Sequence, residues 1–255
     1  MRTATCAPAL AVLLGSAVAP ALAADAGAGR VPADWPHVHE DDQNFGYLLV
    51  DRLEYRADDG PDHLLWDAQG WYGGDYRRLW LKTEGESPVS NSHGEAELQA
   101  LYGRLVAPYW DLQAGLRYDR AYGSGRDRDR AFGVLGVQGL APYRFDTELA
   151  LFVSEDGDVS ARAQFEHELL LSQRLVLQPR LEINAAAQEV KSWGVGRGID
   201  DVQLGLRLRY ELRRQFAPYV GVEWVRTLGD SADFARAKGL ETSNFGLVAG
   251  LRLWF

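Results

Sequence analysis

The stretch N-F-G-L-V-A-G-L-R-L-W-F, from Asn244 to Phe255, ends the chain and decides the fold. Apolar residues, all but Ala249 large, occupy every second position from Phe245 to Phe255, and the positions between them hold Gly246, Val248, Gly250, Arg252 and Trp254. Side chains of a β-strand alternate between two faces, so a period of two indicates a strand rather than a helix. This segment is therefore predicted to be a strand of a sheet with one strongly apolar face.

The same alternation recurs along most of the chain. We predict strands at 45–56, 63–72, 77–86, 94–106, 110–119, 131–140, 144–153, 159–170, 175–185, 202–212, 218–226 and 244–255. Each has about the length that a tilted strand needs to cross a membrane as part of a barrel, and their number is even. The pattern therefore favours an all-β chain that forms one closed antiparallel sheet.

The connections between these strands alternate in length. Tight turns are predicted at 73–76, 107–109, 141–143, 172–174 and 213–216, and long loops near 119–130, 186–201 and 227–243. Short turns on one side and long loops on the other are typical of membrane barrels, with both termini on the short, periplasmic side. Ala-Pro-Tyr occurs at 107, 141 and 217, each time at a predicted periplasmic turn, where the tyrosine would lie at the membrane interface.

The amino terminus reads as a secretory signal peptide. Arg2 precedes a short apolar run, and Ala21-Leu22-Ala23 fits a cleavage site, so 1–23 is expected to be removed. Cys6 would leave with it, and the mature chain would then hold no cysteine and no disulfide. No later stretch has about 18 continuous apolar residues, which argues against a helical membrane protein. We expect a periplasmic lead-in at 24–43 and one barrel at 44–255.

The signal peptide, the terminal Phe255 and the strand pattern together resemble a bacterial outer-membrane β-barrel. The expected fold is thus a transmembrane antiparallel β-barrel of about twelve strands, in contact with outer-membrane lipid, with a short periplasmic amino-terminal tail. A charge that faces lipid at mid-membrane costs about 2–4 kcal/mol, so the charged face of each strand should line the lumen. These inward residues are expected to form ion-paired networks and to leave no wide diffusion pore: Glu97, Arg117, Arg162, Glu166, Arg180, Glu182, Arg207, Arg209, Glu223 and Arg252.

The chain is acidic overall, with 27 basic and 36 acidic residues and a net charge of −9. Loss of Arg2 with the signal peptide would make it one charge more acidic. Nucleic acid attracts proteins through basic surfaces, so a nucleic-acid partner is not expected.

The lead-in contains the one pair of closely spaced histidines, in Asp34-Trp35-Pro36-His37-Val38-His39-Glu40-Asp41-Asp42. In extended chain, His-x-His places both imidazoles on one side, and the flanking carboxylates add hard oxygen donors. One interpretation is a metal-collecting segment; the other is a flexible acidic tail in which the histidines are incidental. His63 is a further candidate ligand, expected to point inward near the external mouth.

The stretch L-W-D-A-Q-G-W-Y-G-G-D-Y-R-R-L-W-L-K-T-E-G-E at 65–86 resembles the signature of the copper resistance protein B family. The similarity continues at 51–56, 115–119, 172–180 and 216–224, and it covers essentially 44–255. The resemblance implies an outer-membrane barrel of a bacterial copper-resistance system that binds, sequesters or helps export periplasmic copper, in concert with a periplasmic copper-resistance protein.

One departure from the family bears on the metal. Family members usually carry a long Met- and His-rich amino-terminal segment, whereas Met1 is the single methionine here and the lead-in has about twenty residues. Thioethers, which suit Cu(I), are therefore missing, and imidazole with carboxylate favours Cu(II) or another borderline cation. The predicted copper ligands are His37, His39, Glu40, Asp41 and His63, and copper is expected as a bound ion without a catalytic role.

Two other classes of function compete with copper handling. One is a structural or small-solute diffusion barrel with no metal role. The other is an outer-membrane phospholipase, which would need a Ser–His pair at the lipid face. His167 is the one histidine expected on that face, and Ser160 and Ser172 lie at other depths, so an enzyme is not expected.

Overall fold

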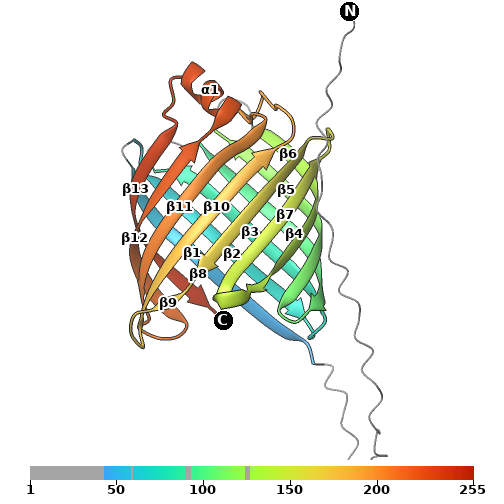
Figure 1. The fold of residues 1–255 in the computed structure, drawn as a ribbon, viewed down its shortest axis with the longest axis vertical. Helices are drawn as coiled ribbons and strands as arrows, with labels where there is room; N and C mark the ends of the chain where they lie inside the picture. Colours follow the sequence, from blue (N-terminus) through green and yellow to red (C-terminus); the bar gives the residue numbers. More distant parts are fainter. Residues whose placement is uncertain (1–42, 59, 90–92, 124–126) are drawn as a thin grey trace, which may run out of the picture. The chain divides into compact units, whose positions relative to one another are not determined.

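The computed structural model describes residues 43–58, 60–89, 93–123 and 127–255. One sheet contains nearly all of them (Figure 1). Its strands are β1 (Phe45–Asp58), β2 (His63–Gly73), β3 (Arg77–Pro88), β4 (Gly94–Ala107), β5 (Trp110–Tyr122), β6 (Arg128–Ala141), β7 (Phe145–Ser154), β8 (Val159–His167), β9 (Leu169–Leu170), β10 (Leu175–Ala186), β11 (Gly198–Tyr210), β12 (Phe216–Thr227) and β13 (Ser243–Trp254). The two helical elements are the short 3₁₀ turn η1 (Pro142–Arg144) and the α-helix α1 (Gly229–Ala237).

The sheet closes on itself into a barrel. Every neighbouring pair is antiparallel, and the last strand, β13, is hydrogen-bonded both to β12 and to β1. Closure removes free strand edges, which would otherwise expose unpaired backbone groups to lipid. The predicted strand at 244–255 therefore has the closing position expected of it, and among the described residues no helix is long and apolar enough to cross a membrane.

The predicted strand at 159–170 is interrupted, which gives thirteen labelled strands for twelve positions in the barrel wall. β8 and β9 both pair with β10 and keep one register, since Arg180 is opposite Glu166 and Leu177 is opposite Leu169. Pro179 lies between these pairs, and proline has no backbone N–H to contribute to the ladder. The prediction of about twelve strands is confirmed, with a break that follows from this proline.

The two ends of the barrel differ as predicted. Short connections join β2 to β3, β4 to β5, β6 to β7, β9 to β10 and β11 to β12, at the end where β1 begins and β13 stops (Figure 1). The longest connections, between β10 and β11 and between β12 and β13, lie at the opposite end. We call the first the inner end and the second the outer end.

The helix α1 was not predicted, because its nine residues lie within the stretch 227–243 that we expected to be a loop. Gly239, with φ +73°, ends it: its N–H donates to the Arg236 carbonyl at 3.0 Å, the usual role of a left-handed glycine after a helix. Ser231 fixes the helix to the sheet by donating to Asp200 Oδ1 at 2.6 Å. The helix thus lies at the outer end of the barrel (Figure 1).

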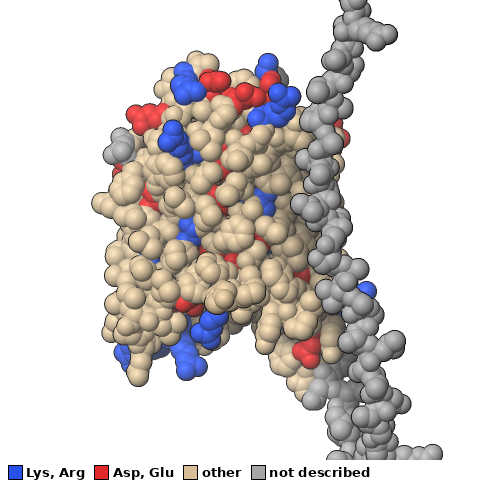
Figure 2. Space-filling view, viewed as in Figure 1, with Lys and Arg blue, Asp and Glu red and all other residues tan. Residues whose placement is uncertain are grey.

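The two faces of the wall are assigned as predicted. Leu204, Leu206 and Leu208 are exposed on the outside of β11, whereas Arg207 and Arg209, between and beside them, are buried in the lumen. Figure 2 shows mostly uncharged atoms over the side of the barrel, with the densest group of charged side chains at its outer end. An apolar belt with charges at the rim and in the lumen is the pattern of a barrel that lies in lipid.

The prediction that the tyrosines of the three Ala-Pro-Tyr repeats lie at the membrane interface is only partly correct. Tyr109 and Tyr143 lie in inner-end turns and are exposed, as expected. The third tyrosine, Tyr219, instead lies within β12 and points into the lumen, where its hydroxyl donates to Glu54 at 3.0 Å. β12 begins at Phe216, so this copy of the motif belongs to a strand and follows the alternation of that strand.

Candidate functional site

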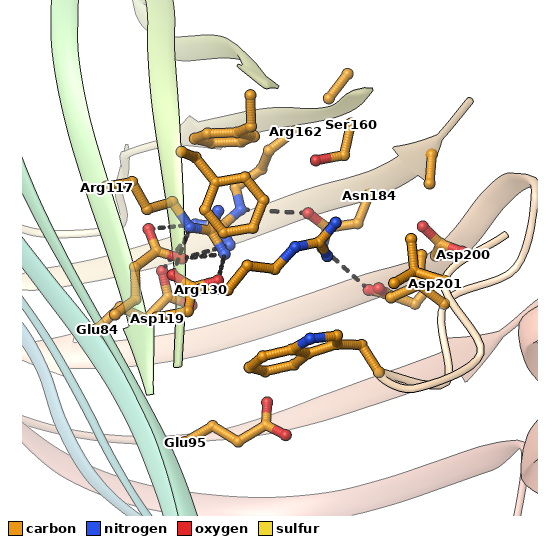
Figure 3. A pocket seen from close by; sticks show the side chains of 18 of the residues that line it. Glu84, Glu95, Arg117, Asp119, Arg130, Ser160, Arg162, Asn184, Asp200 and Asp201 are labelled. Atoms are coloured by element: carbon orange, nitrogen blue, oxygen red, sulfur yellow. Dashed lines mark hydrogen bonds and ion pairs between the residues drawn. The ribbon is translucent and has the colours of Figure 1, made fainter. Parts of the chain in front are cut away.

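Two cavities occupy the lumen, one above the other. The outer cavity, of about 360 Å³, is lined by β1 to β8, β10, β11 and the β10–β11 loop (Figure 3). The inner cavity, of about 280 Å³, is lined mainly by β1 to β4 and β6 to β8. Of the described strands, β12 contributes no lining residue to either cavity. These cavities are the concave sites that a small ligand could occupy.

Both cavities have an excess of acidic side chains. Five arginines and eight carboxylates line the outer cavity among the described residues, and the inner cavity has three cationic side chains and seven carboxylates. Glu95 lines the outer cavity and Asp146 lines the inner cavity, and neither forms an ion pair with another described residue. A low-dielectric cavity with an excess of one sign attracts ions of the other sign, so both cavities favour cations.

Ion pairs cross the lumen and divide it. Arg162 on β8 donates to Glu84 Oε2 on β3 at 3.2 Å and to Glu97 Oε2 on β4 at 3.0 Å. Four strands, β4 to β7, lie between β8 and β3, so the guanidinium of Arg162 spans the lumen. At the inner level, Lys82 Nζ lies 2.7 Å from Glu148 Oε2 across the same space. The predicted ion-paired lumen is confirmed.

The remaining side of the lumen is filled by a buried charged cluster. Arg207 on β11 donates to Glu54 Oε1 at 2.7 Å and to Glu223 Oε2 at 3.0 Å, and Arg52 Nη1 lies 4.0 Å from Glu223. Tyr219 donates to the same Glu54 carboxylate. Buried charges are tolerated when they are paired and hydrogen-bonded. This cluster links β1, β11 and β12 through buried, paired charges.

His63 lies at the outer end of β2 and is largely buried, with 18% of its side chain exposed. Its Nδ1 contacts Glu86, and its Nε2 lies 3.9 Å from Asp58 Oδ2. Arg56 holds the same two carboxylates, at 2.9 Å from Asp58 and 2.8 Å from Glu86. His63 therefore points inward near the outer mouth, as expected, but shares its acidic neighbours with a fixed cation.

The other predicted ligands cannot be placed. His37, His39, Glu40 and Asp41 lie outside the described residues. Within the described part of the chain, no three His, Cys, Asp or Glu side chains are grouped so that they could hold a metal ion. The predicted copper ligands therefore stay a prediction.

His167 lies on the outer face at the inner end, where we expected it. Its ring stacks on Phe145 with centroids 4.7 Å apart, and its Nδ1 is 3.0 Å from the Arg144 carbonyl oxygen. Ser172 lies in the turn before β10 and accepts hydrogen bonds from the backbone of Arg174 and Leu175. The backbone carbonyl and the aromatic stack account for the position of this imidazole.

Alternation alone missed part of the luminal site on β1. The register of β1 against β2 shifts between Val50 and Arg52, which is a β-bulge. The bulge turns two consecutive residues inward: Asp51 accepts from Arg252 at 2.7 Å, and Arg52 donates to Asp67 at 3.0 Å. A bulge adds one residue to one strand and so breaks the period of two. Two adjacent charged residues within an otherwise alternating strand are the only local signal for it.

The family comparison agrees with the resemblance in the sequence. Residues 44–255 match the family model described as "Copper resistance protein B precursor (CopB)". The chain is 43% identical over 219 residues to copper resistance protein B of Escherichia coli, and 40% identical over 218 residues to the copper resistance protein B homolog of Pseudomonas syringae pv. tomato. Each alignment covers 86% of this chain and 72% of the relative.

Among solved structures, the NanC porin superposes with a TM-score of 0.53 at 9% sequence identity, over 81% of this chain and 98% of the porin chain. At that identity the likeness shows a shared barrel fold and nothing about the ligand.

Proposed function

The chain belongs to the copper resistance protein B family, and from this premise we propose that it is an outer-membrane barrel that binds periplasmic copper ions and keeps them from the cell by sequestration or export. The observation that carries the proposal is the acidic excess of both luminal cavities. Carboxylate-lined cavities attract cations and disfavour anions. The role we propose is non-enzymatic: copper is the ion that the protein binds or transports.

The first copper ligands that we propose are His37 and His39, supported by Glu40 and Asp41. The lead-in offers the only closely spaced imidazoles, and methionine and cysteine are absent downstream of Cys6. Imidazole with carboxylate suits Cu(II). His63 is a secondary candidate, because Arg56 neutralises the carboxylates around it. A periplasmic copper-resistance protein that exchanges the ion with this tail is the partner that the family implies.

The competing function, free diffusion of small solutes, is opposed by the ion pairs that cross the lumen. A diffusion channel needs a continuous aqueous path, as in large porins. Here Arg162 and Lys82 bridge opposite walls at two levels. We therefore propose selective handling of an ion over passive diffusion.

Replacing both His37 and His39 with alanine is expected to lower the amount of Cu(II) that the purified mature chain retains. Only neutral imidazole binds metal, so the copper affinity of the wild-type chain should also weaken as the pH falls below about 6.5, the usual histidine pKa. The copper content after equilibration and dialysis, measured by elemental mass spectrometry across pH, checks both results.

The matched control is H93A/H167A, which removes the same number of histidines, one from the β3–β4 loop and one from the lipid-side stack with Phe145. It should retain copper like the wild type. If H37A/H39A also bound copper with unchanged stoichiometry and affinity, the ligands would not be in the lead-in, and H63A would test the remaining predicted ligand.

A further inference from the structure

The two luminal cavities are separated by a partition of three side chains. Glu84, Glu97 and Arg162 are the described residues that line both cavities. Glu84 and Glu97 are direct cross-strand partners on β3 and β4, and the guanidinium of Arg162 reaches both from β8. Figure 3 shows Arg162 and Arg117 close to Glu84. One guanidinium thus links the two glutamates at the boundary between the outer and inner spaces.

We propose that Arg162 is the gate of a cation path through the lumen, and that an inorganic cation opens it by replacing the guanidinium at Glu84 and Glu97. This inference concerns how ions cross the lumen, so it goes beyond the binding role proposed above. Like charges directly opposite each other on adjacent strands repel, so the two glutamates need a counter-ion. Arg52 lies 3.7 Å from Glu84 and Arg117 lies 2.7 Å from Glu97, but Arg162 is the cation that contacts both glutamates in the closed state. A divalent cation would take this bridging position in the open state.

Arg162 has further acceptors beside the glutamates. Its Nε donates to Asn184 Oδ1 at 3.2 Å and lies 3.6 Å from Glu182 Oε1, both on β10, which is the neighbour of β8 in the wall. When a cation takes the glutamates, the guanidinium keeps these two acceptors. A buried cation without any acceptor is strongly destabilising, so these remaining contacts make the exchange feasible.

The other cation at the partition is fixed. Arg117 on β5 lies 2.7 Å from Glu97, but both its Nε and its Nη2 also donate to Asp119, each at 2.7 Å, on the same strand. β5 is next to β4, so this pair lies along the wall and does not cross the lumen. Arg117 therefore shapes the site of Glu97, and Arg162 alone of the two can open or close the passage.

The test is the conductance of single barrels in planar lipid bilayers with potassium chloride on both sides. We expect R162Q to conduct about ten-fold more than the wild type or better, with a reversal potential that shows cation preference, because the glutamates are then free to face the path. R162K keeps a cation at the partition and should stay close to the wild type.

The control is R209Q. Arg209 is also a buried luminal arginine, where it donates to Gln178 Oε1 at 2.7 Å and to Glu168 Oε1 at 2.9 Å, but it lines neither cavity. Its conductance should equal that of the wild type. Equal conductance of R162Q and wild type, or an equal rise in R209Q, would overturn the gate.

Loss of Arg162 removes one of the cations beside Glu84 and Glu97, and the change in gel mobility between unheated and heated protein shows whether the variant folds. The triple variant R162Q/E84Q/E97Q removes the repulsion as well. It should conduct like R162Q but with reduced cation preference, whereas a closed triple variant would show that the barrier lies elsewhere.

Ion exchange at the gate has its own readout. Adding copper(II) chloride at constant potassium chloride should raise the conductance of the wild type and leave R162Q unchanged, because R162Q has no guanidinium to displace. A wild type that does not respond would overturn the exchange step. Copper retention by the lead-in is measured separately, so failure of the gate and failure of copper binding give different results.

Discussion

Replacing Arg207 with methionine is expected to lower the free energy of unfolding of the barrel by about 3–5 kcal/mol, the largest effect of any substitution considered. Methionine fills similar space but leaves Glu54 and Glu223 without the guanidinium that donates to both. Their side chains are 0% and 2% exposed, so water cannot replace it. Arg52 Nη1, 4.0 Å from Glu223, compensates only in part. Unfolding of the barrel in lipid vesicles by the denaturant guanidinium chloride, followed by tryptophan fluorescence, measures the change in the free energy of unfolding.

The control for this prediction is an exposed ion pair elsewhere in the chain. Arg236 and Asp233 on α1 are 62% and 69% exposed, and R236M should change stability by less than about 1 kcal/mol. The triple variant R207M/E54Q/E223Q, which removes all three charges, should regain much of the loss, since an uncharged cluster has no unpaired ion to bury. A loss below about 1 kcal/mol for R207M itself would contradict the role given to this cluster.

A charge placed on the outer face of the wall is expected to have the next largest effect. Leu135 lies near the middle of β6, between Ala114 and Leu151 on the adjacent strands, and is 53% exposed. L135R should lower the stability of the barrel in lipid by about 2–4 kcal/mol, because the guanidinium would sit in hydrocarbon. The same unfolding assay, or the yield of folded protein in vesicles, checks the result.

Leu240 provides the matched control, because it is 60% exposed but lies between α1 and β13 at the outer end. L240R should be close to neutral, since the new charge remains in water. Equal losses for L135R and L240R, or no loss for either, would show that the outer face of β6 does not lie in lipid.

The strand order and the two faces followed directly from the sequence. In β11 the leucines at 204, 206 and 208 and the arginines at 207 and 209 can point only to opposite sides of a strand, so placing one of these residues places the others. The length of each connection then fixes which end of the barrel it joins. Local patterns carry this information, and that is why the predicted strands agree with those observed to within a few residues.

Features that depend on a single residue or on distant contacts were harder to predict. Pro179 interrupts the pairing of the neighbouring strand without disturbing the alternation of its own. The bulge at Asp51 adds one residue to β1, and the helix α1 depends on Asp200, thirty-one residues before Ser231, for its anchor. None of these features leaves a periodic signal, because each is a departure from periodicity or a tertiary contact.

The sequence predicted that charged side chains line the lumen, but it did not predict how these side chains are arranged relative to one another. Alternation shows that Arg162, Glu84 and Glu97 point inward, yet it gives neither their depth nor their position around the barrel. Strand tilt and shear determine those coordinates, and they bring Arg162 of β8 to the same level as the glutamates of β3 and β4. The partition and the two cavities therefore required the structure.

The central claim, that this barrel protects the cell from copper, is tested most directly by growth of a strain that lacks the gene in graded concentrations of a copper(II) salt. We expect that strain to tolerate less copper than its parent, the wild-type chain to restore tolerance, and the H37A/H39A variant, present at an equal level in the membrane, to restore it only in part. The parent and the deletion strain should grow alike without added copper. Equal copper tolerance of the parent and the deletion strain would contradict the account.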